Sequence, residues 1–227
     1  MLAALYGDVI QAGEPSNPDR DRFILSKGHA ALALYAALSL NGTLPVAALD
    51  TFCADNSVVG VHPEHFLTGI DFSTGSLGHG LSLATGAALA ARMEGSSRKV
   101  YALLSDAECN EGSVWEAAMF ASHHRLSNLT AMVDKNGQQA LGYTKDVLDL
   151  DPLNEKWTAF GWDCIVVDGH DVSAMKNAIL APRDTRPRVL ICQTTFGKGV
   201  SYMEREIKWH YLPMSDADYD AAVAEVG

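Results

Sequence analysis

Two polar side chains that suit metal binding stand 30 residues apart, each at the end of an apolar run. Asp106 follows residues 100–104, and Asn136 follows residues 129–133. Each run is short enough for a buried strand, and an acidic turn with Gly112 leads into a helical pattern between them. Strand, helix and strand at this spacing predict a βαβ unit, which binds its ligands at the carboxyl ends of the strands.

The chemistry of the two side chains indicates which ligand such an edge would hold. A carboxylate and a carboxamide that face one crevice are hard oxygen donors, suited to Mg²⁺ or Ca²⁺. Because two protein side chains leave coordination positions open, the metal would hold the phosphates of a cofactor. The alternative is an ordinary turn in which Asp106 caps a helix.

The rest of the chain predicts one α/β domain, residues 1–227, that positions these groups. With 227 residues, of which 48% are hydrophobic and 20% charged, the chain can bury a sizeable core. We expect a doubly wound, mostly parallel sheet flanked by helices. Strands are expected at residues 100–104, 129–133, 162–167 and 187–194, helices at 2–11, 30–40, 45–53, 81–93, 115–122, 152–160 and 172–180, and a loop at 142–151.

Composition excludes several classes of protein. The net charge of −11 argues against nucleic acid and against an anionic membrane surface as partners. No stretch approaches the roughly 20 apolar residues of a membrane helix, and no signal peptide is evident. The four cysteines form no CxxC pair, which indicates reduced thiols in a cytoplasmic protein.

Two glycine-containing turns offer further ligand contacts. Gly28 and His29 open a helix, where free amides and a donor side chain can face an anion. Residues 73–80, STGSLGHG, place three glycines within six residues, so that the backbone can approach a flat or charged ligand closely. The helix that follows has a face of small residues at positions 80, 84, 87, 88 and 91. Small residues permit close contact, either in an interface between chains or in a core. We expect this helix to form part of an exposed apolar rim through which two copies of the chain associate.

Five segments, in this order along the chain, resemble the transketolase family. They are DRDRFILSKGHA (19–30), VHPE (61–64), STGSLGHG (73–80), SDAECNEGSVWEA (105–117) and AFGWDCIVVDGHD (159–171). The likeness extends over roughly residues 2–213. It implies the diphosphate-binding (PP-type) form of the thiamine-diphosphate-binding fold, with thiamine diphosphate and Mg²⁺ or Ca²⁺ as cofactors.

The resemblance also implies roles for individual residues. Asp106, Asn136 and the main-chain oxygen of Gln138 would bind the metal, while His29 would bind the diphosphate beside Ala107. The family motif reads GDG where this chain has Ser105-Asp106-Ala107, which adds Cβ atoms next to the diphosphate.

The remaining family contacts concern the rings of the cofactor and the substrate. Gly75 would meet the aminopyrimidine and Leu77 the thiazolium ring. His62 would bind a ketose hydroxyl, and Glu111 would join a network where two active sites meet. His210 would reach the diphosphate and the substrate carbonyl, the alternative being an exposed histidine near the end of the chain.

The resemblance implies the N-terminal subunit of a split transketolase. Its partner would be a C-terminal subunit that carries the pyrimidine-binding and C-terminal domains, in an α₂β₂ assembly. The pair would transfer a two-carbon ketol unit from a ketose (phosphate) to an aldose (phosphate), and the single chain would be inactive. Alternatives are a non-catalytic scaffolding or regulatory subunit, the α subunit of a 2-oxoacid dehydrogenase, and a nucleotide-binding Rossmann domain. The family segment Ser-Gly-His-Pro-Gly does not occur in the sequence.

Overall fold

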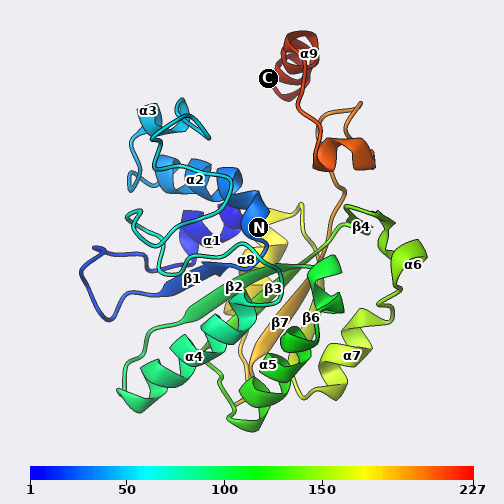
Figure 1. Ribbon diagram of the computed structural model, residues 1–227. Coiled ribbons are helices and arrows are strands. Elements are labelled where there is room, and N and C mark those ends of the chain that lie inside the picture. The colour runs from blue at the N-terminus through cyan, green and yellow to red at the C-terminus, as the bar shows by residue number, and fades with distance from the viewer.

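A parallel sheet forms the centre of the molecule in a computed structural model that describes residues 1–227. Its five strands follow the order β1 (Arg22–Leu25), β2 (Val100–Ser105), β3 (Leu129–Lys135), β7 (Arg188–Gln193) and β6 (Asp163–Asp168) (Figure 1). Every pair of neighbouring strands in this sheet is parallel. The predicted fold class is therefore confirmed.

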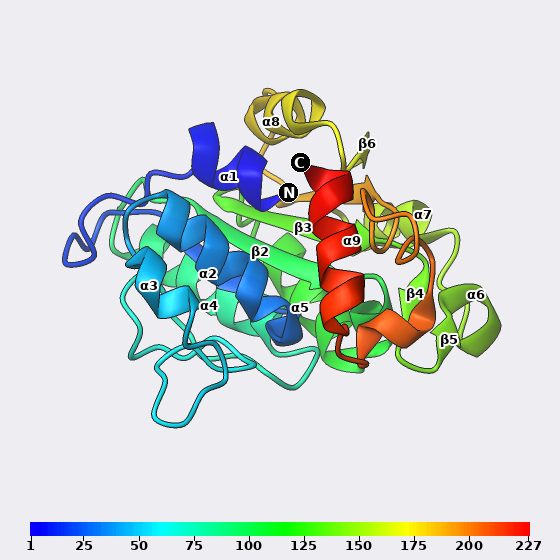
Figure 2. The ribbon, with the colours of Figure 1, turned by 90° about the horizontal axis from the view of Figure 1, so that it is seen from above.

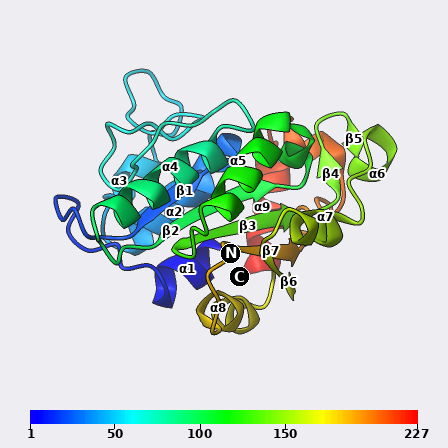
Figure 3. The ribbon, with the colours of Figure 1, turned by 90° about the horizontal axis from the view of Figure 1, so that it is seen from below.

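Helices cover both faces of the sheet, as Figures 2 and 3 show from opposite sides. The helices α1 (Leu2–Asp8), α2 (Ala31–Leu40) and α8 (Val172–Leu180) pack on one face. The other face carries α4 (Gly80–Met93), α5 (Gly112–His123) and α7 (Leu153–Ala159). Strand residues alternate between the two cores, with Leu103 in the first and Ala102 and Leu104 in the second. Burial on both faces explains why the strands read as continuous apolar runs.

Some elements differ from the prediction. The expected loop at residues 142–151 contains strand β5 (Gly142–Tyr143), paired with β4 (Gln138–Gln139), and helix α6 (Thr144–Val147). Helix α3 covers only Val46–Leu49 rather than residues 45–53. Strand β1 and the C-terminal helix α9 (Asp216–Val226) were not predicted from the sequence. Helix α9 buries none of its residues. Helix α9 begins with a capping box between Ser215 and Asp218. No helix combines the length and the apolar character that crossing a membrane requires.

The small-residue face of α4 lies in the core of this chain. Gly80, Ala84, Ala88 and Ala91 are buried, and the helix packs against β1, β2 and α5. A Cβ atom on Gly80 would overlap the side chain of Ser26, at the end of β1. The expectation that this face forms an exposed apolar rim between chains is therefore wrong, because close packing inside the chain uses the small residues.

Two glycines of α4 provide a matched test of this packing. Gly80→Ala is expected to lower the free energy of unfolding by about 1–3 kcal/mol, since the methyl group has no space beside Ser26. Gly86→Ala is expected to raise it by about 0.5–1 kcal/mol, because Gly86 is exposed and its Cβ would meet nothing within 4 Å. Urea unfolding followed by circular dichroism measures both. Equal effects would contradict the packing argument.

Candidate functional site

The residues predicted as metal ligands lie at the carboxyl ends of two adjacent strands. Strand β2 pairs with β3 so that Ser105 lies opposite Asp134, and Asp106 and Asn136 each follow directly after these strands. Asp106 Oδ2 accepts a hydrogen bond of 2.8 Å from the amide of Gly137, in the turn that carries Asn136. The structure therefore brings the two predicted ligand residues together across 30 residues of sequence.

Asp106 is a buried carboxylate without a cationic partner. It is 2% exposed, and its oxygens accept hydrogen bonds from the amides of Ala107 and Gly137, each 2.8 Å long. Burial raises the pKa of Asp106 to about 6, although the two amides oppose this shift. A buried carboxylate of this kind is suited to a bound cation, because buried charges are stable only when they are paired or coordinate a metal.

The turn after β3 supplies the other oxygen donors. Asn136 Oδ1 accepts a hydrogen bond of 2.9 Å from the amide of Gln138, which fixes the side chain against its own turn. Gln138 begins β4, and its Nε2 donates to the carbonyl of Arg205 over 2.6 Å. This bond ties the turn to the segment that carries His210. The predicted ligand atoms of Asp106, Asn136 and Gln138 are all oxygens, a set that suits a hard divalent cation.

A lysine that the sequence analysis did not single out lies beside these residues. Lys27 Nζ forms an ion pair of 2.6 Å with Asp134 Oδ2, and Thr194 Oγ1 donates to Asp134 Oδ1 over 2.5 Å. Burial would raise the pKa of Asp134, but Lys27 and Thr194 outweigh it and hold the pKa below its usual value. Lys27 directly precedes the predicted Gly28-His29 turn. A basic side chain at that position was the sequence signal that could have identified it. It adds a positive charge to the wall of the site.

A cavity of about 560 Å³ opens above these strand ends. Its wall includes seven of the residues that the sequence predicts for the site: His29, Leu77, Ala107, Glu111, Asn136, Gln138 and His210. The rings of His29 and His210 meet edge to face, with 5.2 Å between their centroids. The structure thus places His210 inside the site, although its predicted role in binding remains a prediction.

His62 and Gly75 line a neighbouring hollow of about 620 Å³. A Cβ on Gly75 would lie 3.6 Å from the His62 ring, so the loop passes directly beside this histidine. The hydroxyl of Tyr35 donates to the carbonyl of His62 over 2.8 Å and fixes its backbone. Glu111 is exposed on the cavity wall of this single chain, and its predicted place between two active sites concerns an assembly.

The imidazole of His29 is uncharged near neutral pH. Desolvation by the surrounding protein, together with the positive charge of Lys27 and the neighbouring His210, lowers its pKa to about 4. A neutral imidazole still has one ring N–H to donate. His29 can therefore donate a hydrogen bond to an anion while the positive charge comes from Lys27.

This pKa predicts how His29 affects stability as pH changes. Above pH 6.5 the imidazole is neutral in both the folded and the unfolded chain, so it contributes nothing. Between pH 6.5 and about 4 only the unfolded chain takes up the proton, so stability falls as pH falls. His29→Asn is expected to lose less stability than the wild type over this interval. NMR titration of the imidazole checks the cause, and a midpoint near 6.5 for His29 would contradict it.

Glu108 is a buried residue of the site that the sequence analysis missed. It is 0% exposed, and it exchanges two hydrogen bonds with Ser105. The amide of Ser105 donates to Glu108 Oε2 over 3.2 Å, and the amide of Glu108 donates to Ser105 Oγ over 3.1 Å. These reciprocal bonds are those of a capping box, for which Ser-x-x-Glu is the sequence signal. They give Ser105, which stands where the family motif has glycine, a local hydrogen-bonding role.

Comparisons with known proteins agree with this geometry. Residues 2–227 match the family described as "Transketolase, thiamine diphosphate binding domain". The chain is 40% identical over 230 residues to one of the subunits of the apulose-4-phosphate transketolase of Phocaeicola vulgatus, covering 100% of this chain and 82% of the relative. It is 41% identical over 231 residues to 6-deoxy-6-sulfo-D-fructose transketolase subunit SqwG of Clostridium sp. MSTE9, covering 100% and 84%.

Solved structures give the same result. The transketolase of Campylobacter jejuni superposes with a TM-score of 0.92 and 29% sequence identity, over 99% of this chain and 37% of that one. The chain thus spans little more than a third of that longer protein. A family match over residues 2–227, together with relatives that align along the whole chain, shows that the chain belongs to the transketolase family as its thiamine diphosphate binding domain.

Proposed function

We propose that this chain binds thiamine diphosphate through a divalent cation and, together with a separate subunit, transfers a two-carbon ketol unit from a ketose or its phosphate to an aldose or its phosphate. The observation that carries the proposal is the buried Asp106 carboxylate, which has no cationic partner and is bonded to the turn that carries Asn136. Asp106, Asn136 and the main-chain oxygen of Gln138 would hold Mg²⁺, or Ca²⁺ in its place.

The residues around the cation suit the two ends of the cofactor. His29, Lys27 and His210 lie on the cavity wall and would donate to the diphosphate. Leu77 presents an apolar side chain on the same wall, suited to the thiazolium ring. When bound, thiamine diphosphate supplies the carbon nucleophile that cleaves a bond beside a ketose carbonyl. His62, beside the loop of Gly75, would orient the substrate through a hydroxyl group.

A partner subunit is proposed on two grounds. Relatives that align with the whole chain are named as subunits of transketolases. Leu141 lines the cavity and is 82% exposed, an apolar side chain at the opening that another chain would cover. We expect the partner to carry the pyrimidine-binding and C-terminal domains and to form an α₂β₂ assembly, in which Glu111 meets the second active site.

The proposal is tested by reconstitution. The purified chain is expected to show no ketol transfer with a panel of ketose and aldose phosphates, and addition of the C-terminal subunit should give transfer that depends on thiamine diphosphate. Size-exclusion chromatography with light scattering measures the assembly. Turnover by the chain alone would contradict the need for a partner. Cofactor binding by the pair without turnover on any substrate would indicate a scaffolding role instead.

A further inference from the structure

The carboxylate of Glu108 connects three segments that surround the cofactor site. Glu108 lies in the short 3₁₀ helix η2 (Ala107–Asn110), directly after the ligand residue Asp106. Its Oε2 closes the capping box with Ser105, at the end of β2. Its Oε1 accepts a hydrogen bond from the hydroxyl of Ser26, at the end of β1, and another of 2.8 Å from the amide of Gly78. Oε2 therefore accepts a hydrogen bond within the local turn, and Oε1 accepts hydrogen bonds from two segments that are distant in the sequence.

The bond to Gly78 fixes the loop that carries Leu77. Gly78 has a φ of +88°, and the hydroxyl of Ser113 donates to its carbonyl over 2.8 Å. Its N–H and C=O groups are thus held from two sides, by Glu108 and by helix α5. The same loop is attached to β1 through Thr74, whose hydroxyl donates to the carbonyl of Leu25 over 2.5 Å. The backbone on both sides of Leu77 is therefore fixed against the strand ends.

We propose that Glu108 is a positioning residue that holds the Leu77–Gly78 loop in the conformation that receives the ring portion of the cofactor. This inference rests on the proposed function. Glu108 is completely buried and is not part of the cavity wall, so it acts through Ser26 and Gly78 rather than by touching the ligand. A loop that is already fixed loses less conformational freedom on binding, and affinity rises accordingly.

The arrangement requires a carboxylate, because both of its oxygens accept hydrogen bonds. A glutamine has one acceptor oxygen and one NH₂ group, which only donates. In Glu108→Gln the NH₂ group can face the N–H of Ser105 and leave the bond to Gly78 in place. The test therefore uses Glu108→Met, which has no carboxylate oxygen and loses both connections. Ser26→Ala removes only the hydroxyl donor and leaves the capping box intact. Glu116→Met, on the exposed side of α5, is the matched control.

The first measurement is hydrogen exchange of the Gly78 amide in the chain without ligand. Loss of a hydrogen bond to a charged acceptor is expected to speed exchange at Gly78 by roughly 10- to 100-fold in Glu108→Met. Ser26→Ala should give a smaller increase, and Glu116→Met none. Because this readout needs no cofactor, it tests the inference even if the proposed function is wrong. An unchanged exchange rate at Gly78 in Glu108→Met would overturn the inference.

The second measurement is calorimetry with Mg²⁺ present. It compares the affinity for thiamine diphosphate with the affinity for inorganic diphosphate, which lacks the ring portion. Glu108→Met is expected to bind thiamine diphosphate roughly 10- to 100-fold more weakly, and inorganic diphosphate about as well as the wild type. An equal loss for both ligands would overturn the inference, because Glu108 would then act on the metal turn. If the wild type bound neither ligand, the proposed function would fail, and the exchange experiment would decide the inference separately.

Discussion

Asp106→Ala is expected to weaken the binding of thiamine diphosphate in the presence of Mg²⁺ by about 100-fold or more. Removal of a residue that merely supports a metal ligand typically costs 10- to 100-fold in affinity, and Asp106 is itself a proposed ligand. The fold should stay intact, because the carboxylate bonds only to two backbone amides and forms no ion pair whose partner would be left behind. Calorimetry measures the affinity, and circular dichroism checks the fold.

Asp168→Ala is the matched control for this prediction. Asp168 also ends a strand of the same sheet, β6, but it is exposed and its carboxylate bonds to the amide of His170 in its own turn. Its replacement should leave cofactor affinity unchanged. Chelation of the metal should abolish binding by the wild type. Tight binding of thiamine diphosphate after the metal has been removed would show that Asp106 and Asn136 do not act through a cation.

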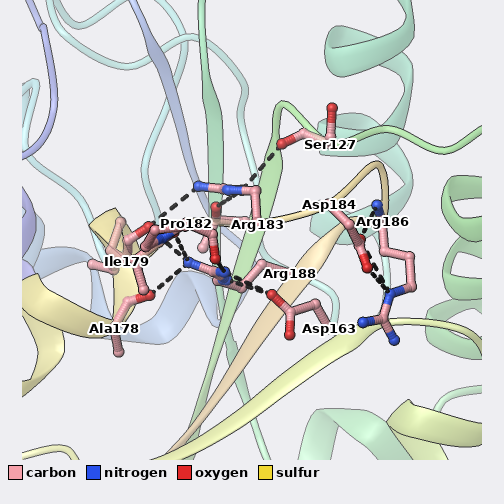
Figure 4. A network of polar contacts seen from close by, with 11 residues as sticks. Ser127, Asp163, Ala178, Ile179, Pro182, Arg183, Asp184, Arg186 and Arg188 are labelled. Atoms are coloured by element: carbon pink, nitrogen blue, oxygen red, sulfur yellow. Dashed lines mark hydrogen bonds and ion pairs between the residues drawn. The ribbon is translucent and has the colours of Figure 1, made fainter.

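Arg188→Met is expected to lower the free energy of unfolding by about 3–5 kcal/mol, because it removes the buried partner of Asp163 and leaves several carbonyl groups without their donor. Arg188 is 1% exposed and lies at the start of β7, at the opposite end of this strand from the site. Figure 4 shows its guanidinium among carbonyl groups at the end of α8 and the carboxylate of Asp163. The distances are 2.7 Å to Asp163 Oδ2, 2.7 Å to the carbonyl of Ala181 and 2.9 Å to that of Pro182.

Arg186→Met provides the control, two residues away. Arg186 pairs with Asp184 on the surface, and both side chains are about half exposed, so the change should cost less than about 1 kcal/mol. For a chain of this length, the loss in Arg188→Met corresponds to a melting temperature roughly 6–20 °C below that of the wild type. Thermal unfolding followed by circular dichroism measures it. Equal losses for the two variants would contradict the assigned role of the buried arginine.

The sequence predicted the centre of the site because its signals are local. The apolar runs before Asp106 and Asn136 have the length of buried strands, and a helical pattern separates them. Parallel strands joined in this way place their carboxyl ends at one edge of the sheet, so the proximity of the two side chains followed from pattern and topology. The site residues His29, Leu77 and His210 came from the family resemblance, and the structure brings them to the same cavity.

Elements with little local signal were missed. Strand β1 has only four residues, too few for a periodic pattern, and its pairing with β2 defines it. Helix α9 buries no residue, so it has no apolar stripe for a periodicity argument to detect. The small face of α4 was assigned to the wrong neighbour, because close contact within a core and close contact between chains require the same small residues.

By itself, then, the sequence determined the parallel α/β architecture, the strand ends that carry Asp106 and Asn136, and the family. Only the tertiary structure decided which charges and hydrogen bonds surround these residues. Lys27 pairs with Asp134, 107 residues later, and Glu108 accepts hydrogen bonds from Ser26 and Gly78, 82 and 30 residues earlier. No local pattern encodes such pairs, because the sheet order and the packing of α4 bring them together. Because burying an unpaired polar group costs free energy, each of these buried groups is stable only beside the partner that the fold gives it.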